Sequence, residues 1–312
     1  MNQRKEEIPV LKIEHLNIAF TQYEQGMNQT ELPVIRNLDV EVHAGELVAV
    51  VGSSGSGKSL LAHGVMGLLP YNASMGGKIT YCGEVLTPEK IGILRGKEIV
   101  LVPQSISYLD PLMKIGKQIR KGRKDDGTRK KLRDIFQRYH LKEEVEELYP
   151  FELSGGMNRR ILVSTALIEE PKLVIADEPT PGLDLKMAKR VMGHFRELAD
   201  LGAGVLVITH DLELALETAD KIVVFYAGTT IEEAECADFK QEETLRHPYT
   251  KALWRAIPGN GFQYIDGNQP YVKDLPSGCP FAPRCGLCTE ECKGEIPYQE
   301  VRGGHVRCLH AE

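Results

Sequence analysis

The sequence predicts an α/β fold: a sheet built from strand–loop–helix units, with an inserted helical region and a small cysteine-rich extension at the carboxyl end. Three observations support this fold class. A glycine-rich octapeptide at residues 52–59 lies between a short apolar run and a segment with helical apolar spacing. A second apolar run ends in the paired acids Asp177 and Glu178. Five of the seven cysteines lie at or after Cys279.

The octapeptide, Gly-Ser-Ser-Gly-Ser-Gly-Lys-Ser, matches the phosphate-binding loop G-x-x-x-x-G-K-S. Its glycines let backbone N–H groups turn toward a β-phosphate, Lys58 can reach the β- and γ-oxygens, and the Ser59 hydroxyl can ligate Mg²⁺. The glycines concerned are Gly52, Gly55 and Gly57. The motif therefore predicts a nucleotide-binding sheet that takes ATP or GTP.

The apolar run before Asp177 is typical of a buried parallel strand, whose carboxyl end is where an open α/β sheet presents its chemistry. Asp177 would hold Mg²⁺. Glu178 points elsewhere because side chains alternate along a strand, and would be free to polarise an attacking water. A solvent-exposed acidic strand end is the alternative for an isolated Asp-Glu pair, and the phosphate loop favours the catalytic interpretation.

The segment Leu153-Ser154-Gly155-Gly156-Met157 precedes an apolar helix. Ser154 can cap that helix, and Gly155 and Gly156 leave its first amides bare, so that a γ-phosphate could bind there. A simple helix cap would use the same residues. The segment resembles the signature motif of ATP-binding-cassette (ABC) ATPases. Methionine at its fifth position is found in the dipeptide, oligopeptide and nickel importers, which the chain most resembles.

The resemblance implies roles for residues that follow in the family's order. Gln104 matches the glutamine that contacts Mg²⁺ and the attacking water, and passes motion to the membrane subunits. His210 matches the switch histidine that contacts the γ-phosphate. Asp184 is retained, although the preceding Pro181-Gly182 departs from the family's Ser/Thr-Ala.

The aromatic residue that stacks on adenine is the remaining nucleotide contact. Phe20 is the expected residue and Tyr23 its rival.

The same resemblance implies a mechanism and partners. Two ATPase subunits would meet head to tail and enclose each ATP between the phosphate loop of one and residues 154–157 of the other. Closure of the two ATPase subunits on each other would drive two membrane permease subunits. ATP hydrolysis at Glu178 would release the closed state. We expect a second, homologous ATPase subunit in a heterodimer, and an extracellular substrate-binding protein as an indirect partner.

Peptide uptake is the expected function, with uptake of nickel or a metal chelate as the alternative. A soluble ABC ATPase of DNA repair or translation is an alternative of another class. The single cassette without a long insertion argues against it.

The expected domain boundaries follow from strand patterns. Residues 10–103 and 163–235 alternate apolar strands with helices and are expected to form two halves of one sheet. The charged region between them has few strand patterns, and its entry at Ser107–Leu112 matches the family's groove for a coupling helix of the permease. The expected units are an ATPase domain at 10–240, its helical subdomain at about 105–162, and a carboxyl-terminal extension at 241–312.

Composition limits the kinds of partner that the chain can bind. A formal net charge of −6 argues against nucleic acid, whose phosphates require a basic face. No run of apolar residues approaches the roughly 18 of a membrane span. The expected location is therefore peripheral, on the cytoplasmic face of the membrane, reached through other proteins.

The clustered cysteines predict a metal centre, because disulfides are rare in the cytosol. Thiolates suit tetrahedral Zn²⁺ or a [4Fe–4S] cluster, and spacing alone does not choose between them. The phrase Gly278–Cys285 resembles the iron–sulfur motif at the end of dipeptide and oligopeptide importer ATPases. On that resemblance the cluster ligands are Cys279, Cys285, Cys292 and Cys308, and Cys288 is an extra thiol. Free thiols or a redox pair remain the third alternative.

Overall fold

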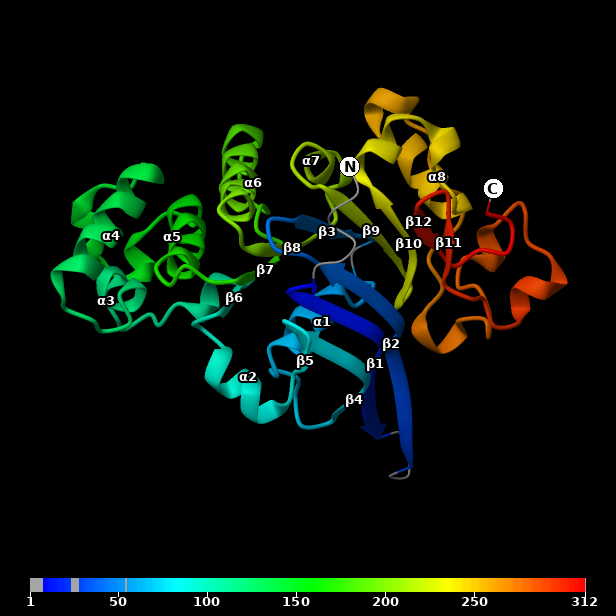
Figure 1. Cartoon of the computed structure of the whole chain (residues 1–312), viewed down its shortest axis with the longest axis horizontal. Helices are drawn as coiled ribbons and strands as arrows, with labels where there is room; N and C mark the ends of the chain where they lie inside the picture. Colours follow the sequence, from blue (N-terminus) through cyan, green and yellow to red (C-terminus); the bar gives the residue numbers. More distant parts are fainter. Residues whose placement is uncertain (1–7, 24–27, 54, 312) are drawn as a thin grey trace.

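The computed structural model describes residues 8–23, 28–53 and 55–311. Ser54, inside the octapeptide, lies outside the described residues. Figure 1 shows three parts in a row: a helical region at one end, two sheets in the centre, and the carboxyl-terminal extension at the other end. Within the described ranges, no helix is both long and apolar enough to cross a membrane.

The larger sheet runs through the centre and carries the predicted loop. Its strands lie in the order β11-β12-β10-β9-β3-β8-β7-β6. The five strands from β9 to β6 are parallel, and β10, β12 and β11 continue the sheet in antiparallel pairing. The strands are β3 (Leu47–Val51), β6 (Ile99–Val102), β7 (Leu173–Asp177), β8 (Gly204–Thr209), β9 (Lys221–Tyr226), β10 (Thr229–Glu235), β11 (Gln299–Val301) and β12 (Gly304–Val306).

The expectation of one sheet for residues 10–103 and 163–235 is wrong. The first strands form a separate antiparallel sheet in the order β2-β1-β4-β5, with β1 paired to both β2 and β4. Its strands are β1 (Leu11–Tyr23), β2 (Gln29–Val42), β4 (Ala73–Tyr81) and β5 (Glu84–Val85). The long first two strands pair with each other over most of their length, which leaves β3, β6 and the later strands to build the parallel sheet.

The region between β6 and β7 is helical, as predicted. It holds α3 (Ile115–Ile119), α4 (Asp126–Arg138), α5 (Gly155–Leu167) and short 3₁₀ turns at Ile106–Tyr108, Glu143–Glu147 and Pro150–Glu152. Leu132, Ile135 and Phe136 lie on the buried face of α4, and Tyr139 follows it in the same core. The apolar residues at helical spacing therefore form part of the core of this region.

The strands of the parallel sheet are buried on both faces, and alternate side chains enter different cores. Val174 and Ala176 of β7 pack with α5 and α6 (Leu185–Asp200), whereas Leu173 and Ile175 pack toward α1 (Lys58–Val65) and the antiparallel sheet. Helix α1 thus lies between the two sheets. The remaining helices are α2 (Pro88–Leu94), α7 (Leu212–Leu216) and α8 (Pro248–Arg255).

The extension is joined to the cassette by backbone and side-chain contacts. Strand β12 pairs with β10, and a third core contains Tyr226, Tyr249 and Phe281. The expected boundary at residue 240 therefore falls between β10 and β12, two paired strands of one sheet. Short 3₁₀ turns lie between β10 and β11, at Cys236–Lys240, Glu242–Thr244, Pro258–Asn260, Val272–Asp274, Ala282–Arg284 and Glu290–Lys293.

Candidate active site

The phosphate loop leaves the carboxyl end of β3, whose five residues are all buried, and enters α1. Gly52 is required by a close approach, because a Cβ there would lie 2.2 Å from the carbonyl oxygen of Phe225. Gly57 precedes the helix at φ 95°, a left-handed conformation that favours glycine. Two neighbouring strands and a left-handed turn therefore shape the loop.

Lys58 is buried at the first position of α1. Its Nζ donates to the carbonyl oxygens of Gly52 and Ser53, each at 2.8 Å. Burial lowers the pKa of this ammonium, while the carboxylates of Glu178 and Asp177 act in the opposite sense. The structure thus places a positive charge directly under the loop, where a phosphate anion would be favoured.

Ser59 and Asp177 meet where α1 starts and β7 ends. The Ser59 hydroxyl donates to Oδ1 of Asp177 at 3.0 Å. Burial raises the pKa of Asp177, and the hydrogen bond from Ser59 opposes that shift. A hydroxyl and a carboxylate from elements far apart in the sequence are thus brought together as two oxygen donors of the kind that Mg²⁺ takes.

Glu178 and His210 form the second pair of the site. Nδ1 of His210, which follows β8, lies 2.8 Å from Oε2 of Glu178, which follows β7. A carboxylate only accepts hydrogen bonds, so Nδ1 carries the proton. The Glu178 side chain is 8% exposed and that of His210 is 57% exposed. The buried carboxylate is therefore held by a ring that reaches the surface.

The backbone at Glu178 is in the left-handed region, at φ 45°. Its N–H donates to the carbonyl oxygen of Ile208 at 2.9 Å, which continues the pairing of β7 with β8 by one residue. Non-glycine residues adopt this conformation only where their surroundings enforce it, and such residues gather at functional sites.

The Ser154 hydroxyl accepts from the N–H of Met157 at 3.3 Å and so caps α5, as predicted. Ser154 and Gly155 are exposed, and a Cβ at Gly155 would have no neighbour within 4 Å among the described residues. The helix therefore presents its amino end to the surface, where a molecule outside this chain could contact it.

Gln104 follows β6, and its side chain is exposed. Asp184 caps α6 by accepting from the N–H of Met187 at 3.0 Å. Phe20 is half-buried and packs against the core under the antiparallel sheet, while Tyr23 is exposed and accepts from Gln29. The adenine-stacking role of Phe20 and the roles of Gln104 and Asp184 stay predictions.

Arg159 also belongs to the site, although none of the sequence motifs includes it. It is buried in α5, and its guanidinium donates to three backbone carbonyl oxygens, those of Pro103, Gln104 and Glu178. One signal could have found it. Arg159 shares a helix face with Leu162 and Val163, both buried, so that an apolar stripe begins with a charge.

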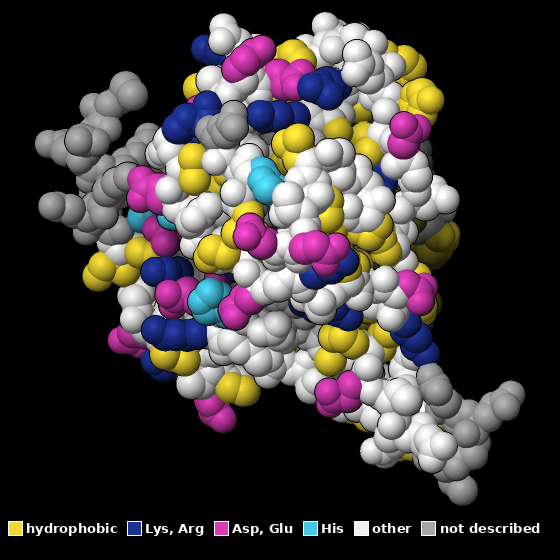
Figure 2. Space-filling model, turned by 90° about the vertical axis from the view of Figure 1, so that its right-hand side faces the viewer, with side chains coloured by type: hydrophobic (Ala, Val, Ile, Leu, Met, Phe, Trp, Pro, Cys, Tyr) yellow, Lys and Arg dark blue, Asp and Glu magenta, His cyan; other side chains and the backbone are white. Residues whose placement is uncertain are grey.

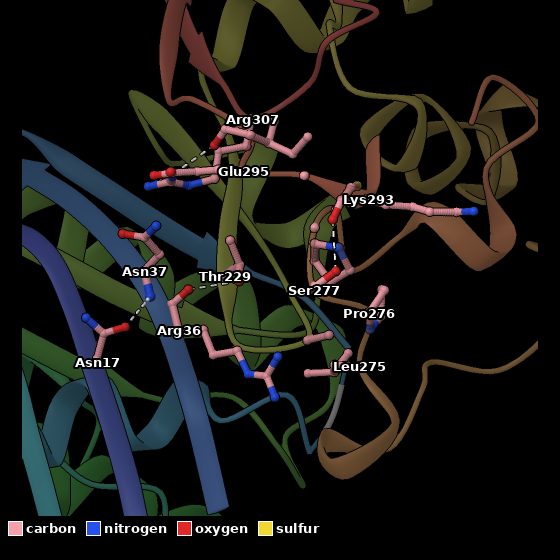
Figure 3. Close-up of a pocket in the computed structure, with 16 residues that line it drawn as sticks. Asn17, Arg36, Asn37, Thr229, Leu275, Pro276, Ser277, Lys293, Glu295 and Arg307 are labelled. Carbon is pink, nitrogen blue, oxygen red and sulfur yellow. Dashed lines mark hydrogen bonds between the residues drawn. The ribbon is translucent and has the colours of Figure 1, made fainter. Parts of the chain in front are cut away.

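The extension also touches the loop. The Ser53 hydroxyl donates to Oε1 of Gln269 at 2.5 Å, and Arg284 donates to the hydroxyl of Tyr226, the last residue of β9. A cavity of about 430 Å³ separates the extension from the antiparallel sheet. Figure 3 shows Asn17 and Asn37 on its sheet side, and Pro276 and Ser277 on its extension side. Among the described residues that line this cavity, none belongs to the predicted ATP site.

The five carboxyl-terminal cysteines gather at one place. One small cavity of about 10 Å³ is lined by Cys279, Cys285, Cys288, Cys292, Cys308, His247 and His310. All of these thiols are free. In the part of the chain that the structure describes, however, no three His, Cys, Asp or Glu side chains are arranged to hold a metal ion. The cysteines that cluster in the sequence are thus also close together in space, but among the described residues their side chains are not arranged to coordinate a metal ion.

Comparisons with known proteins identify the family of this chain. The family model described as ABC transporter matches residues 35–181, and that described as oligopeptide/dipeptide transporter, C-terminal region, matches residues 231–292. The oligopeptide transport ATP-binding protein OppD of Escherichia coli K12 is 33% identical, over 96% of this chain and 92% of OppD. The chain belongs to this ABC transporter family. Another member, the dipeptide transport ATP-binding protein DppD of Bacillus subtilis, is 33% identical, over 94% of the chain and 91% of DppD.

Solved ABC cassettes share the fold. The dimeric structure of MJ0796, a bacterial ABC transporter cassette, superposes with a TM-score of 0.62 at 23% identity, over 72% of this chain and 98% of MJ0796. CbiO1 of Clostridium perfringens, part of the CbiONQ transporter complex, gives a TM-score of 0.61 at 25% identity, over 79% and 99% of the two chains. The α/β fold predicted for the cassette is thus confirmed. The match to the ABC transporter family supports ATP binding by the cassette.

Proposed function

We propose that this chain is the ATP-hydrolysing subunit of an importer that carries peptides across the cytoplasmic membrane. One observation carries the proposal: the similarity to peptide transport ATP-binding proteins runs through both the cassette and the cysteine-bearing extension. The pairing of Glu178 with His210, beside Lys58 and Asp177, supports hydrolysis in addition to binding.

In this proposal the loop after β3 and the buried ammonium of Lys58 bind the β- and γ-phosphates of ATP. The hydroxyl of Ser59 and the carboxylate of Asp177 fit Mg²⁺ as oxygen donors that already contact each other, and Gln104 contributes a further oxygen. When bound, Mg²⁺ neutralises charge on the phosphate oxygens. Gly52, Gly55 and Gly57 shape the backbone that faces the phosphates.

Glu178 is the catalytic base of the proposed reaction. Its carboxylate accepts a proton from the attacking water, and the N–H of His210 orients that carboxylate while the exposed ring faces the γ-phosphate. Oxygen from the water forms the new bond to the γ-phosphorus as the bond to the β-phosphate oxygen breaks. The products are ADP and inorganic phosphate.

A second ATPase subunit completes the site. The exposed amino end of α5, with Ser154, Gly155 and Gly156, is suited to contact the γ-phosphate bound by another cassette. Asp184, at the start of α6, belongs to the same dimer contact in this proposal. We expect a heterodimer with a homologous ATPase, and the subunit composition of the purified transporter tests this.

The permease contact is supported by apolar side chains exposed directly after Gln104. Ile106, Tyr108 and Leu112 are all exposed, and Leu112 is 86% exposed. Their position after the glutamine segment suits a groove for a coupling helix of the permease, and it accounts for a peripheral position on the cytoplasmic face of the membrane. Two permease subunits and an extracellular peptide-binding protein are the partners of this proposal.

For the extension we propose a [4Fe–4S] cluster held by Cys279, Cys285, Cys292 and Cys308, with Zn²⁺ as the alternative. The support is the donor set, since five thiols line one cavity. Burial raises the pKa of the Cys279 thiol to about 11. Cys285 adjoins an exposed turn, so that its thiol has room to turn outward around a group larger than the cavity.

Metal analysis of the full chain, purified without oxygen, tests the cysteine centre. We expect about four irons and a broad visible absorption, and Cys279→Ser should lose both while ATP binding persists. One equivalent of zinc in place of iron would establish the alternative. A colourless, metal-free protein would refute both.

The alternatives receive less support. OppD and DppD are peptide transport ATP-binding proteins, which favours peptides over nickel or metal chelates. Figure 2 shows the face that includes the extension, where basic and acidic side chains are interspersed and form no continuous basic surface. That face does not suit a nucleic acid, which a DNA-repair or translation ATPase would have to contact.

Uptake by cells of the native host tests the proposed function. Cells with the wild-type chain and cells with Glu178→Gln are supplied with a labelled tripeptide, or with labelled nickel, free or chelated. We expect the variant to lose peptide uptake and to retain nickel uptake. Loss of nickel uptake alone would move the chain to the metal-chelate branch, and unchanged uptake of both would refute the transporter assignment.

A further inference from the structure

Arg159 is a buried guanidinium that contacts three separate backbone segments. Its Nη1 donates to the carbonyl oxygens of Pro103 at 3.1 Å and Gln104 at 2.7 Å, and its Nη2 donates to that of Glu178 at 2.8 Å. The residue is 5% exposed. One side chain of the helical region therefore holds both the glutamine segment and the proposed catalytic base.

These acceptors are neutral carbonyls, and the carboxylates of Glu178 and Asp177 are the charges that act on the guanidinium. Burying a cation without a directly paired carboxylate is costly, so the position is one that a packing role alone would fill better with an apolar residue. A guanidinium offers what an apolar residue lacks, a rigid fork of donors that fixes several oxygens relative to one another.

The backbone conformation of Glu178 indicates a role for the guanidinium of Arg159. The φ of 45° at Glu178 is a strained conformation for a side-chain-bearing residue. Two bonds hold this backbone: its N–H donates to Ile208, and its carbonyl oxygen accepts from Arg159. Without the second bond, the peptide after Glu178 is free to relax and to move the carboxylate away from His210.

We propose that Arg159 is a positioning residue for ATP hydrolysis. It fixes Glu178 and Gln104 in one geometry and makes that geometry depend on the position of α5, the helix that begins at the signature segment. The inference rests on the proposed role of Glu178. A rotation of the helical region would therefore move Arg159, and through Arg159 it would change the position of Glu178 relative to the attacking water.

The test uses Arg159→Lys, which keeps the charge and loses the fork, and Arg159→Gln, which keeps two donors and loses the charge. ATP turnover is measured in the transporter purified from its host through a tag on this chain. We expect kcat per bound nucleotide to fall about 30- to 100-fold, the loss that a displacement of about 1 Å can cause. The KM for ATP should change by less than about threefold, because ground-state contacts are retained.

Arg196→Lys is the control. Arg196 also donates to a backbone oxygen, that of Gly45, and in addition pairs with Asp200 and Asp220; it lies on α6 at the amino end of β3, away from the loop. The Arg196→Lys variant should lose about as much thermal stability as Arg159→Lys, while its kcat should be unchanged. If Arg159→Lys also retains wild-type kcat per bound nucleotide, the inference is wrong.

A double variant separates positioning from a general structural role. If Arg159 acts through Glu178, adding Arg159→Lys to Glu178→Gln should lower the residual rate no further. Multiplying losses would overturn the inference while leaving the proposed function intact. Wild-type turnover in Glu178→Gln alone would instead overturn the proposed function.

Discussion

At the scale of single residues, the phosphate loop depends on glycines for two different reasons. Gly52 is in direct contact with the backbone of β9, where a Cβ would lie 2.2 Å from the carbonyl oxygen of Phe225. A Cβ at Gly55 would meet nothing within 4 Å among the described residues, but Gly55 adopts φ 76°. The first position is limited by space and the second by backbone conformation alone.

We therefore expect Gly52→Ala to abolish ATP binding, because the loop must move away from β9 to admit the methyl group. Gly55→Ala should cost about 1 kcal/mol of backbone strain and weaken binding by less than tenfold. Titration with a fluorescent ATP analogue measures both dissociation constants. Equal losses in the two variants would contradict the steric explanation.

Lys58→Ala should weaken ATP binding about 10- to 100-fold, since charge-assisted hydrogen bonds contribute about 1.5–3 kcal/mol each. The physical reason is the loss of the buried ammonium under the loop. The same titration measures this effect. A wild-type dissociation constant would rule out Lys58 as a phosphate contact.

Sequence patterns predict residues whose role is local, and they miss those whose role depends on distant partners. The loop motif predicts Lys58 and Ser59, and the strand end predicts Asp177, because each pattern spans a few residues. The partners of Arg159 lie 55, 56 and 19 positions away. No local pattern contains them.

At the scale of elements, the sequence predicts the strand and helix types better than their pairing. The apolar run of β3 and the helical spacing in α4 are each confirmed. The separation of β1, β2 and β4 from the parallel sheet was not predicted, because pairing partners are chosen over long distances in the sequence. Alternation of side chains constrains which face a strand buries, but it does not say which strand lies beside it.

The contact of α6 with the helical region contains an acid-sensitive group. The buried His194 ring packs against Tyr139, with ring centroids 4.3 Å apart, and its Nδ1 lies 3.4 Å from Glu197. Burial lowers the pKa of His194 from 6.5 to about 4, and the nearby cations Arg138 and Arg190 act in the same direction. The folded protein therefore keeps this ring neutral at a pH where the unfolded chain is protonated.

Between pH 6.5 and 4 the unfolded chain binds one more proton at His194, so the free energy of unfolding should fall on acidification by up to about 1.4 kcal/mol per pH unit. His194→Gln should remove this contribution, and its stability difference from the wild type should shift accordingly between pH 7 and pH 4.5. Urea unfolding at several pH values measures it. A difference that is constant with pH would contradict the buried neutral ring.

At the scale of the whole molecule, the extension and the cassette share a sheet and a buried ionic network. Glu232 of β10 is fully buried and accepts from the backbone N–H groups of Arg246 and His247 at 2.9 and 2.8 Å. Arg246 in turn pairs with Asp238. The clustering of cysteines in the sequence indicates a distinct unit, but it does not reveal that β12 completes the edge of the cassette.

Removal of residues 241–312 should therefore destabilise the cassette, because it leaves the buried carboxylate of Glu232 without its donors and uncovers the third core. We expect the truncated chain to be insoluble or to melt at a lower temperature than the full chain. Adding Glu232→Gln to the truncated chain should recover part of the loss. A truncated chain with the melting temperature of the full chain would show that the extension is an independent unit.

The central claim is that this chain hydrolyses ATP with Glu178 as the base. The most direct measurement compares ATP turnover and ATP occupancy in the purified transporter carrying the wild-type chain or Glu178→Gln. We predict that the variant binds ATP with wild-type affinity and retains the nucleotide uncleaved, with turnover at this site reduced at least about 100-fold. Undiminished turnover at this site in the variant would contradict the account.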